Sequence, residues 1–232
     1  MVLDVRLRAA ADLVPRSARL ADIGSDHAYL PIALCLEGKI NCALASDINE
    51  GPVTAAIANI NKNGLSDKIT AIRADGLELA RDFAPDCITV LGMGGELIVS
   101  ILDAAPWIRD ERITLVLQPM THPETLAKYL AREGFAVTAE RIVRDGGRDD
   151  RIYRVMSARY TGERYDLSEA EALIGKEGLR ASDGVTCAYV ERLIRVYGTR
   201  AAGKRSAGQD TSAEEALIKE FKEILERSHE GN

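Results

Sequence analysis

The residues best suited to chemistry lie in one short segment, Leu20 to Pro31, which reads Leu-Ala-Asp-Ile-Gly-Ser-Asp-His-Ala-Tyr-Leu-Pro. An apolar strand there runs into a glycine, and two ionisable side chains follow before a helix begins. In α/β proteins a strand, a turn and a helix in this order commonly seat a nucleotide-like cofactor. The segment therefore predicts a cofactor site that includes Asp22 and Gly24.

A second acidic strand end, Ala45-Ser46-Asp47-Ile48-Asn49, follows further along the chain. A carboxylate at this position has the lone pairs to accept hydrogen bonds from both hydroxyls of a ribose, so Asp47 is the candidate for that contact. Asp47 also fits a turn or a cap of the helix entered at Pro52. Taken alone, the residue leaves both readings open.

A third acidic strand end is formed by Asp75 and Gly76. Asp75 can accept the exocyclic amino group of an adenine, with the Gly76 amide facing the ring and the Ile48 side chain covering it, although an isolated Asp-Gly is more often only a turn. One adenosine-containing ligand would explain Asp47, Asp75 and Gly24 together. The chain lacks Gly-x-Gly-x-x-Gly, which counts against binding of NAD.

Apolar runs alternate with helical patterns over the first half of the chain, which predicts a parallel sheet. An opening helix at Leu3 to Val14 precedes the first strand. We expect strands at 19–23, 42–46, 69–73, 87–92 and 114–118, with helices such as 52–63 and 96–104 between them.

The alternation of strands and helices ends after the fifth strand. A helix at 124–133 is followed there by two strands, at 136–144 and 151–159, joined by a glycine-rich turn. This is the layout of the α/β, Rossmann-like class I methyltransferase fold: a seven-stranded, mostly parallel sheet with an antiparallel terminal hairpin. The rest reads as helical, with apolar stripes typical of a short coiled-coil-like hairpin. We therefore expect a methyltransferase domain at 1–160 and a small C-terminal helical domain at 161–232.

The formal net charge is -6, which argues against a protein that binds nucleic acid through its overall charge. One run from Arg192 to Gln209 is nevertheless basic and free of acidic residues. The chain shows no secretion signal and no membrane span, and its scattered cysteines support neither a zinc site nor a disulfide framework, so we expect a cytoplasmic protein.

The motifs taken together closely resemble the TrmK family of bacterial tRNA methyltransferases. The resemblance rests on Leu20 to Pro31, Ser46-Asp-Ile-Asn49, Ala74-Asp-Gly76, Gly92-Met-Gly-Gly95 and Leu117-Gln-Pro119, and covers residues 3–160. It implies transfer of a methyl group from S-adenosylmethionine to N1 of adenine 22 in tRNA. It also implies that cofactor-binding residues are Asp22, Gly24, Ser25, Asp47, Ile48, Asp75, Gly76, Gly92 and Met93, and that Gly94, Gly95, Gln118 and Pro119 face the substrate.

The expected reaction makes modest demands on acid or base catalysis, because adenine N1 already carries a lone pair and positioning can supply much of the acceleration. Asp26 is the candidate to accept from the adenine amino group or to stabilise the developing cation, and His27 to orient it. Asp26 can alternatively cap the helix that starts near Tyr29. Tyr29 is the first candidate to stack on the target base, since the glycine loop lacks an aromatic residue.

An adenine in tRNA must be turned out of its stack to expose N1, so further RNA contacts are expected. The candidates for phosphate contacts are Arg192, Arg195, Arg200, Lys204 and Arg205, with Arg195, Arg200 and Lys204 as the primary set. Arg6, Arg8, Arg144 and Arg148 are the next candidates. We expect no metal and a monomer, with a dimer as the alternative. Two other functions remain open: a methyltransferase for a small molecule, and a non-catalytic RNA-binding or assembly protein.

Overall fold

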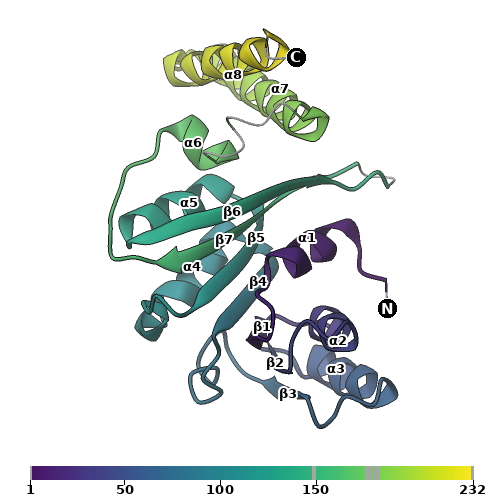
Figure 1. Ribbon diagram of the computed structural model, residues 1–232. Coiled ribbons are helices and arrows are strands. Elements are labelled where there is room, and N and C mark those ends of the chain that lie inside the picture. The colour runs from purple at the N-terminus through teal and green to yellow at the C-terminus, as the bar shows by residue number, and fades with distance from the viewer. Residues whose placement is uncertain (1, 148–149, 176–178, 180–182, 231–232) are drawn as a thin grey trace.

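Seven strands of the described chain form one sheet in the order β3-β2-β1-β4-β5-β7-β6 (Figure 1). The computed structural model describes residues 2–147, 150–175, 179 and 183–230. β1 to β5 run parallel, whereas β7 pairs antiparallel with β5 and with β6, so the predicted fold is confirmed. The strands are β1 (Arg19–Ile23), β2 (Cys42–Asp47), β3 (Ile69–Arg73), β4 (Cys87–Gly94), β5 (Thr114–Thr121), β6 (Phe135–Arg144) and β7 (Ile152–Tyr160).

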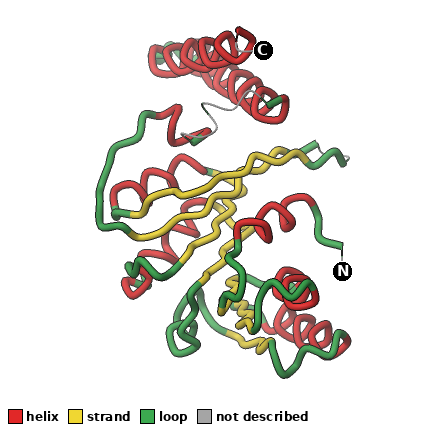
Figure 2. Tube along the Cα trace, viewed as in Figure 1, coloured by secondary structure: helices red, strands yellow, loops and turns green. Residues whose placement is uncertain are grey.

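Helices cover both faces of this sheet, as Figure 2 shows. One face carries α1 (Val5–Leu13), α2 (Tyr29–Leu36) and α3 (Glu50–Lys62); the other carries α4 (Gly95–Asp103), the single-turn helix η1 (Pro106–Ile108) and α5 (Pro123–Arg132). Leu20 of β1 belongs to the first core, and the next residue, Ala21, belongs to the second. Burial on both faces explains why the central strands read as nearly continuous apolar runs.

The segment expected as a glycine loop at 92–95 is mostly strand. β4 continues through Gly94, and β5 continues past its expected end at Gln118 to Thr121. The pairing of these strands shifts register on both sides of Met93, which marks a β-bulge. Because a bulge adds twist and redirects the chain, the glycines lie on a bent strand that leads directly into α4.

The C-terminal part consists of α6 (Glu169–Ile174), α7 (Gly184–Ser206) and α8 (Ser212–Glu230). Ser168 and Glu171 form a capping box at the start of α6. The apolar faces of α7 and α8 pack against each other, with Tyr197 and Phe221 in edge contact at 6.2 Å. That residues 161–232 fold as a domain of their own stays a prediction.

A buried ion pair ties these helices to the sheet. Arg154 of β7 is 4% exposed and pairs with Glu140 of β6. The same guanidinium donates to the carbonyl oxygens of Ala172 (2.5 Å) and Leu173 (3.1 Å) near the end of α6. Because each charged group is satisfied, the pair can lie out of water, and it orients α6 against the hairpin.

Gly95 is predicted to be irreplaceable at the start of α4. A β-carbon there would lie 2.2 Å from the carbonyl oxygen of His122, so Gly95→Ala must displace backbone. We expect the free energy of unfolding to fall by about 1–3 kcal/mol in urea denaturation. Gly198→Ala in α7, where a β-carbon meets nothing within 4 Å, is the matched control and should gain about 0.5–1 kcal/mol. Equal stability of the two variants would contradict the packing argument.

Candidate active site

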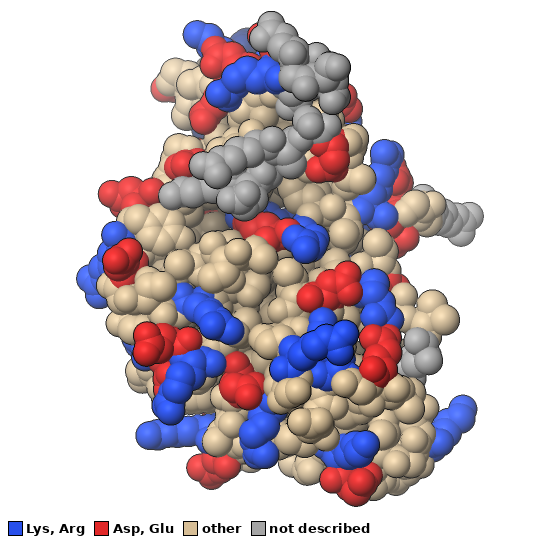
Figure 3. Space-filling model, viewed as in Figure 1, with Lys and Arg blue, Asp and Glu red and all other residues tan. Residues whose placement is uncertain are grey.

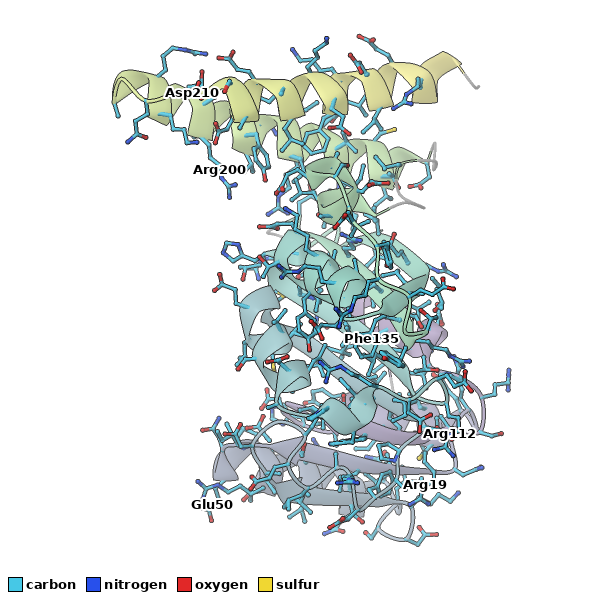
Figure 4. The ribbon with its side chains drawn as sticks, turned by 90° about the vertical axis from the view of Figure 1, so that its left-hand side faces the viewer. Arg19, Glu50, Arg112, Phe135, Arg200 and Asp210 are labelled. Carbon is cyan, nitrogen blue, oxygen red and sulfur yellow. The ribbon has the colours of Figure 1, made fainter. Side chains whose placement is uncertain are left out.

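The carboxyl ends of β3, β2, β1 and β4 meet at one edge of the sheet. The amides of Gly24 and Ser25 both donate to the Ser46 carbonyl (2.8 Å), and the Ala74 amide donates to the Asp47 carbonyl (3.0 Å). Figure 4 shows the polarity: Glu50, which follows β2, lies on the opposite side from Arg19 and Arg112, at the amino ends of β1 and β5. The strand order reverses between β1 and β4, which is where open α/β sheets bind ligands.

Asp22 of β1 is a buried carboxylate with two hydroxyl donors. The Ser25 and Thr89 hydroxyls each lie 2.6 Å from it. Burial raises the pKa of Asp22, because removal from water disfavours the charged form, while these hydroxyls and the nearby Arg6 guanidinium act in the opposite direction. A cationic ligand group beside Asp22 would favour the charged form of this carboxyl group.

A cavity of about 250 Å³ opens beside Asp22, between the end of β1 and helix α1. We call it the β1 cavity. Its walls bring together the predicted Gly24, Ser25, Asp26, His27 and Tyr29, and add Asp4, Arg6, Leu7 and Leu91.

A larger cavity of about 1010 Å³, the β3 cavity, lies beyond the end of β3. Ile48, Asp75 and Gly76 line it together with Trp107 and residues of α4. Ile48 is 52% exposed, which suits a side chain that covers a flat ring. Asp75 and Gly76 therefore share a cavity with the apolar residue predicted to accompany them.

Asp47 lies between the two cavities but lines neither of them. It ends β2, the strand between β1 and β3, and one carboxylate oxygen accepts the amide hydrogen of Asn49 at 2.8 Å. A ligand that occupies both cavities must cross the end of β2. The turn interaction and a ribose contact are compatible, since a carboxylate accepts several hydrogen bonds.

Gly24 allows another residue to approach the β1 turn closely. Its φ is +72°, and a β-carbon there would lie 2.1 Å from Cε of Met93. The Met93 side chain thus packs over the turn, and the positive φ favours glycine at position 24.

Gln118 holds the bulged strand in place from the core. Its side chain is fully buried, and its oxygen accepts from the Gly92 amide (3.0 Å) and from Nη1 of Arg6 (3.1 Å). Its amide nitrogen donates to the Pro119 carbonyl (2.9 Å). Of the residues expected to face the substrate, Gln118, Pro119 and Gly95 are buried and Gly94 is half-buried, so their contact with a substrate stays a prediction.

Asp26, His27 and Tyr29 gather at the mouth of the β1 cavity. The Asp26 side chain is 71% exposed and lies 3.5 Å from Nε2 of His27, which stacks on Tyr29 with ring centroids 5.0 Å apart. Tyr29 itself is 43% exposed. The capping alternative for Asp26 is wrong, because the N-cap of α2 is Ala28 and no side chain caps it.

The last two basic residues of the run on α7 are paired with acidic residues of α8. Lys204 pairs with Glu214 (2.5 Å) and Arg205 with Glu215 (2.6 Å), which sequence order alone does not reveal. Two of the secondary candidates are also paired: Arg8 with Glu37 and Arg144 with Asp150. Arg148 lies outside the described residues, and on the face seen in Figure 3 charges of both signs are interspersed.

Other arginines of α7 stay near the sheet. A groove of about 280 Å³ runs from the end of β5 to α7 and is lined by Met120, His122, Arg192 and Arg200, among others. Arg200 also lies over the Tyr197 ring at 4.8 Å. Figure 4 shows Arg200 below the helical hairpin, on the side of the molecule where Glu50 lies. Arg195 is exposed, but only Arg200 of the three primary candidates lines this groove.

His122 is the N-cap residue of α5, with a φ of 51°. Within the described residues, no helix combines the length and apolar character needed to cross a membrane. The same residues contain no cluster of three or more His, Cys, Asp or Glu side chains arranged to hold a metal ion.

Known proteins share this architecture. A family model described as a methyltransferase domain matches residues 3–156. The tRNA (adenine(22)-N(1))-methyltransferase of Bacillus subtilis is 38% identical over 156 residues, which are 67% of this chain and 64% of that protein. The solved structure of B. subtilis m1A22 tRNA methyltransferase TrmK is 30% identical with a TM-score of 0.80, over 99% of this chain and 98% of that one. Streptococcus pneumoniae Sp1610, solved in complex with S-adenosyl-L-methionine, is 29% identical with a TM-score of 0.81, over 97% and 100%.

The strand order, the acidic strand ends and the family match together define a Rossmann-like methyltransferase domain. The chain belongs to the TrmK family, as its motifs predicted.

Asp22→Asn should be at least as stable as the wild type at neutral pH. The raised pKa means that the folded state binds a proton more tightly than the unfolded chain, so the ionised carboxylate costs stability above its folded pKa and costs none below its unfolded pKa. We expect urea denaturation to show a gain for Asp22→Asn at pH 7 that shrinks toward pH 4. Asp67→Asn, at an exposed position, is the control. A loss of stability at pH 7 would contradict this assignment.

Proposed function

We propose that this chain transfers a methyl group from S-adenosylmethionine to N1 of adenine 22 in tRNA. The observation that carries the proposal is the arrangement of Asp22, Asp47 and Asp75 at the ends of three adjacent strands, beside two cavities on one sheet edge. The B. subtilis relative named for this activity supports it. Such a substrate implies work in the cytoplasm, and we expect a monomer because the apolar faces of α7 and α8 cover each other.

The donor set suits a nucleoside with an amino-acid tail. Asp75 would accept a hydrogen bond from the adenine amino group, Gly76 would face the adenine ring, and Ile48 would cover it. Asp47 would accept hydrogen bonds from the ribose hydroxyls. Asp22, Gly24 and Ser25 would hold the amino-acid end in the β1 cavity, with Gly92 and Met93 between the two ends. When bound, this cofactor would supply a methyl group carried on a sulfonium sulfur.

The protein's own part in the reaction is to position and to stabilise charge. Methylation at N1 turns the neutral adenine into a cation, and the exposed carboxylate of Asp26 can stabilise that charge or accept from the N6 amino group. The His27–Tyr29 stack offers a ring face to a base that has left its helix. Gln118 fixes the Gly92 amide and so holds the bulged strand that carries Gly94.

Turning a base out of a folded tRNA costs on the order of a few kcal/mol, which further contacts must offset. The groove from Met120 and His122 to Arg192 and Arg200 begins at the end of β5, next to the proposed site. We assign the phosphate contacts to Arg192 and Arg200, with exposed Arg195 at the periphery. Lys204 loses this role because Glu214 neutralises it.

The direct test is to incubate the purified chain with labelled cofactor and a tRNA transcript and to map the modified nucleotide. We expect N1-methyladenine at position 22, no product with a transcript that carries guanine at that position, and none with free adenosine. Asp47→Asn should raise the Kd for S-adenosylhomocysteine by about tenfold. Methylation of free adenosine would favour a small-molecule enzyme, and failure to bind the cofactor would favour a non-catalytic RNA-binding protein.

Arg192 and Arg200 can be tested by the salt dependence of tRNA affinity. Their joint replacement by Met should lower the log-log slope by about two units, because each lost phosphate contact removes about one. The control is Lys204→Met with Glu214→Gln, which removes a neutral pair and should leave the slope nearly unchanged. An equal effect of both double variants would overturn the assignment of the groove.

A further inference from the structure

The groove between β5 and α7 contains an apolar side chain that phosphate binding does not explain. Met120, near the end of β5, lines this groove and is 40% exposed. Of the large apolar side chains that are exposed in the described part of the chain, only Met120 and Val196 line the groove. A thioether offers neither charge nor a strong hydrogen-bond donor to a phosphate. The position of Met120 therefore suits contact with the bases of a nucleic acid and not with its backbone.

Met120 lies beside the strand that leads into the proposed site. β5 pairs with the bulged end of β4, and the residues on either side of Met120 lie opposite Met93 and Gly94. Val196 belongs to α7, on the other wall of the groove. Of the two exposed apolar side chains, Met120 is thus the one next to Gly94.

The buried side chain of Gln118 holds this methionine. Its amide nitrogen donates to Sδ of Met120 at 3.5 Å. Its oxygen accepts from the Gly92 amide and from Arg6, which lines the β1 cavity. One buried amide therefore connects the groove, the bulged strand and the β1 cavity, and Met120 keeps a defined place relative to all three.

We infer that Met120 is a wedge that enters the gap left in the RNA stack when the target adenine turns out. The inference rests on the proposed function, since it assigns a further contact with the same substrate. Proteins that distort nucleic acids insert apolar side chains between bases, and methionine is one of the types they use. Its unbranched, flexible side chain fills irregular gaps well. The apolar surface of Met120 then replaces part of the stacking that the adenine has left.

A wedge acts on the opening of the stack and not on the transfer of the methyl group. Its loss should slow methylation of an adenine that starts in a base pair. The loss should matter much less for an adenine that starts unpaired, because such a base turns out at the least cost. A residue that only supports the fold would affect both substrates alike.

The test is single-turnover methylation of two tRNA transcripts, with the enzyme in excess and S-adenosylmethionine saturating. Adenine 22 has a pairing partner in the first transcript, and in the second that partner is replaced by a base that cannot pair with adenine. Met120→Ala should slow methylation of the paired transcript by about tenfold and of the unpaired transcript by no more than about twofold. Its Kd for S-adenosylhomocysteine should stay within about twofold of the wild-type value.

Three further variants make the comparison specific. Met120→Leu keeps an apolar wedge and should hold the wild-type rate on both transcripts within about threefold. Met120→Gln keeps the length but makes the tip polar, so it should behave as Met120→Ala does and serves if that variant does not fold. Leu36→Ala is the matched control, because Leu36 is 50% exposed but ends α2 away from the groove. Thermal unfolding checks that each variant is native.

Two results would overturn the inference. One is slowing by Met120→Ala that is equal for both transcripts or larger for the unpaired one, which would mean that Met120 acts through Gln118 and the fold. The other is unchanged methylation of the paired transcript. If the wild type methylates neither transcript at N1 of adenine 22, the proposed function itself fails.

Discussion

The functional edge of this protein depends on a constraint of parallel sheets. A strand that pairs parallel to its neighbour is reached through a crossover connection, and because β1 to β5 are all parallel, their carboxyl ends lie at the same edge of the sheet. β1 pairs with both β2 and β4, so the strands that follow extend the sheet in one direction from β1 to β3 and in the other direction from β4 to β5. The crevice this creates brings together residues far apart in sequence, such as Asp22 and Asp75.

Most of the strand positions could be predicted from the sequence, because strands buried on both faces appear as continuous apolar runs. β1 and β3 begin and end where their apolar runs do, at Arg19–Ile23 and Ile69–Arg73. The glycines after Leu91 were misleading, since Gly92 to Gly94 continue β4 as a bulge. Glycine is rare within strands but common at bulges, and nothing local distinguishes a bulged strand from a loop.

The individual roles of polar residues were harder to predict because they depend on long-range contacts. Gln118 is buried and spans the core to reach Arg6, a contact between residues 112 positions apart. The acid-free run of α7 is neutralised in part by α8 once the two helices fold back on each other, because Lys204 then pairs with Glu214 and Arg205 with Glu215. Charge counted along a chain is therefore a poor measure of charge presented at a surface.

Trp107 is the single tryptophan of the chain, and it lies in the wall of the β3 cavity, half-buried against the core of α4 and α5. Its indole emission is therefore a built-in optical probe of that cavity. Occupation of the cavity by a stacking ring system would change the polarity around the indole and quench it. Binding rates could then be followed by stopped-flow without any label or engineered fluorophore.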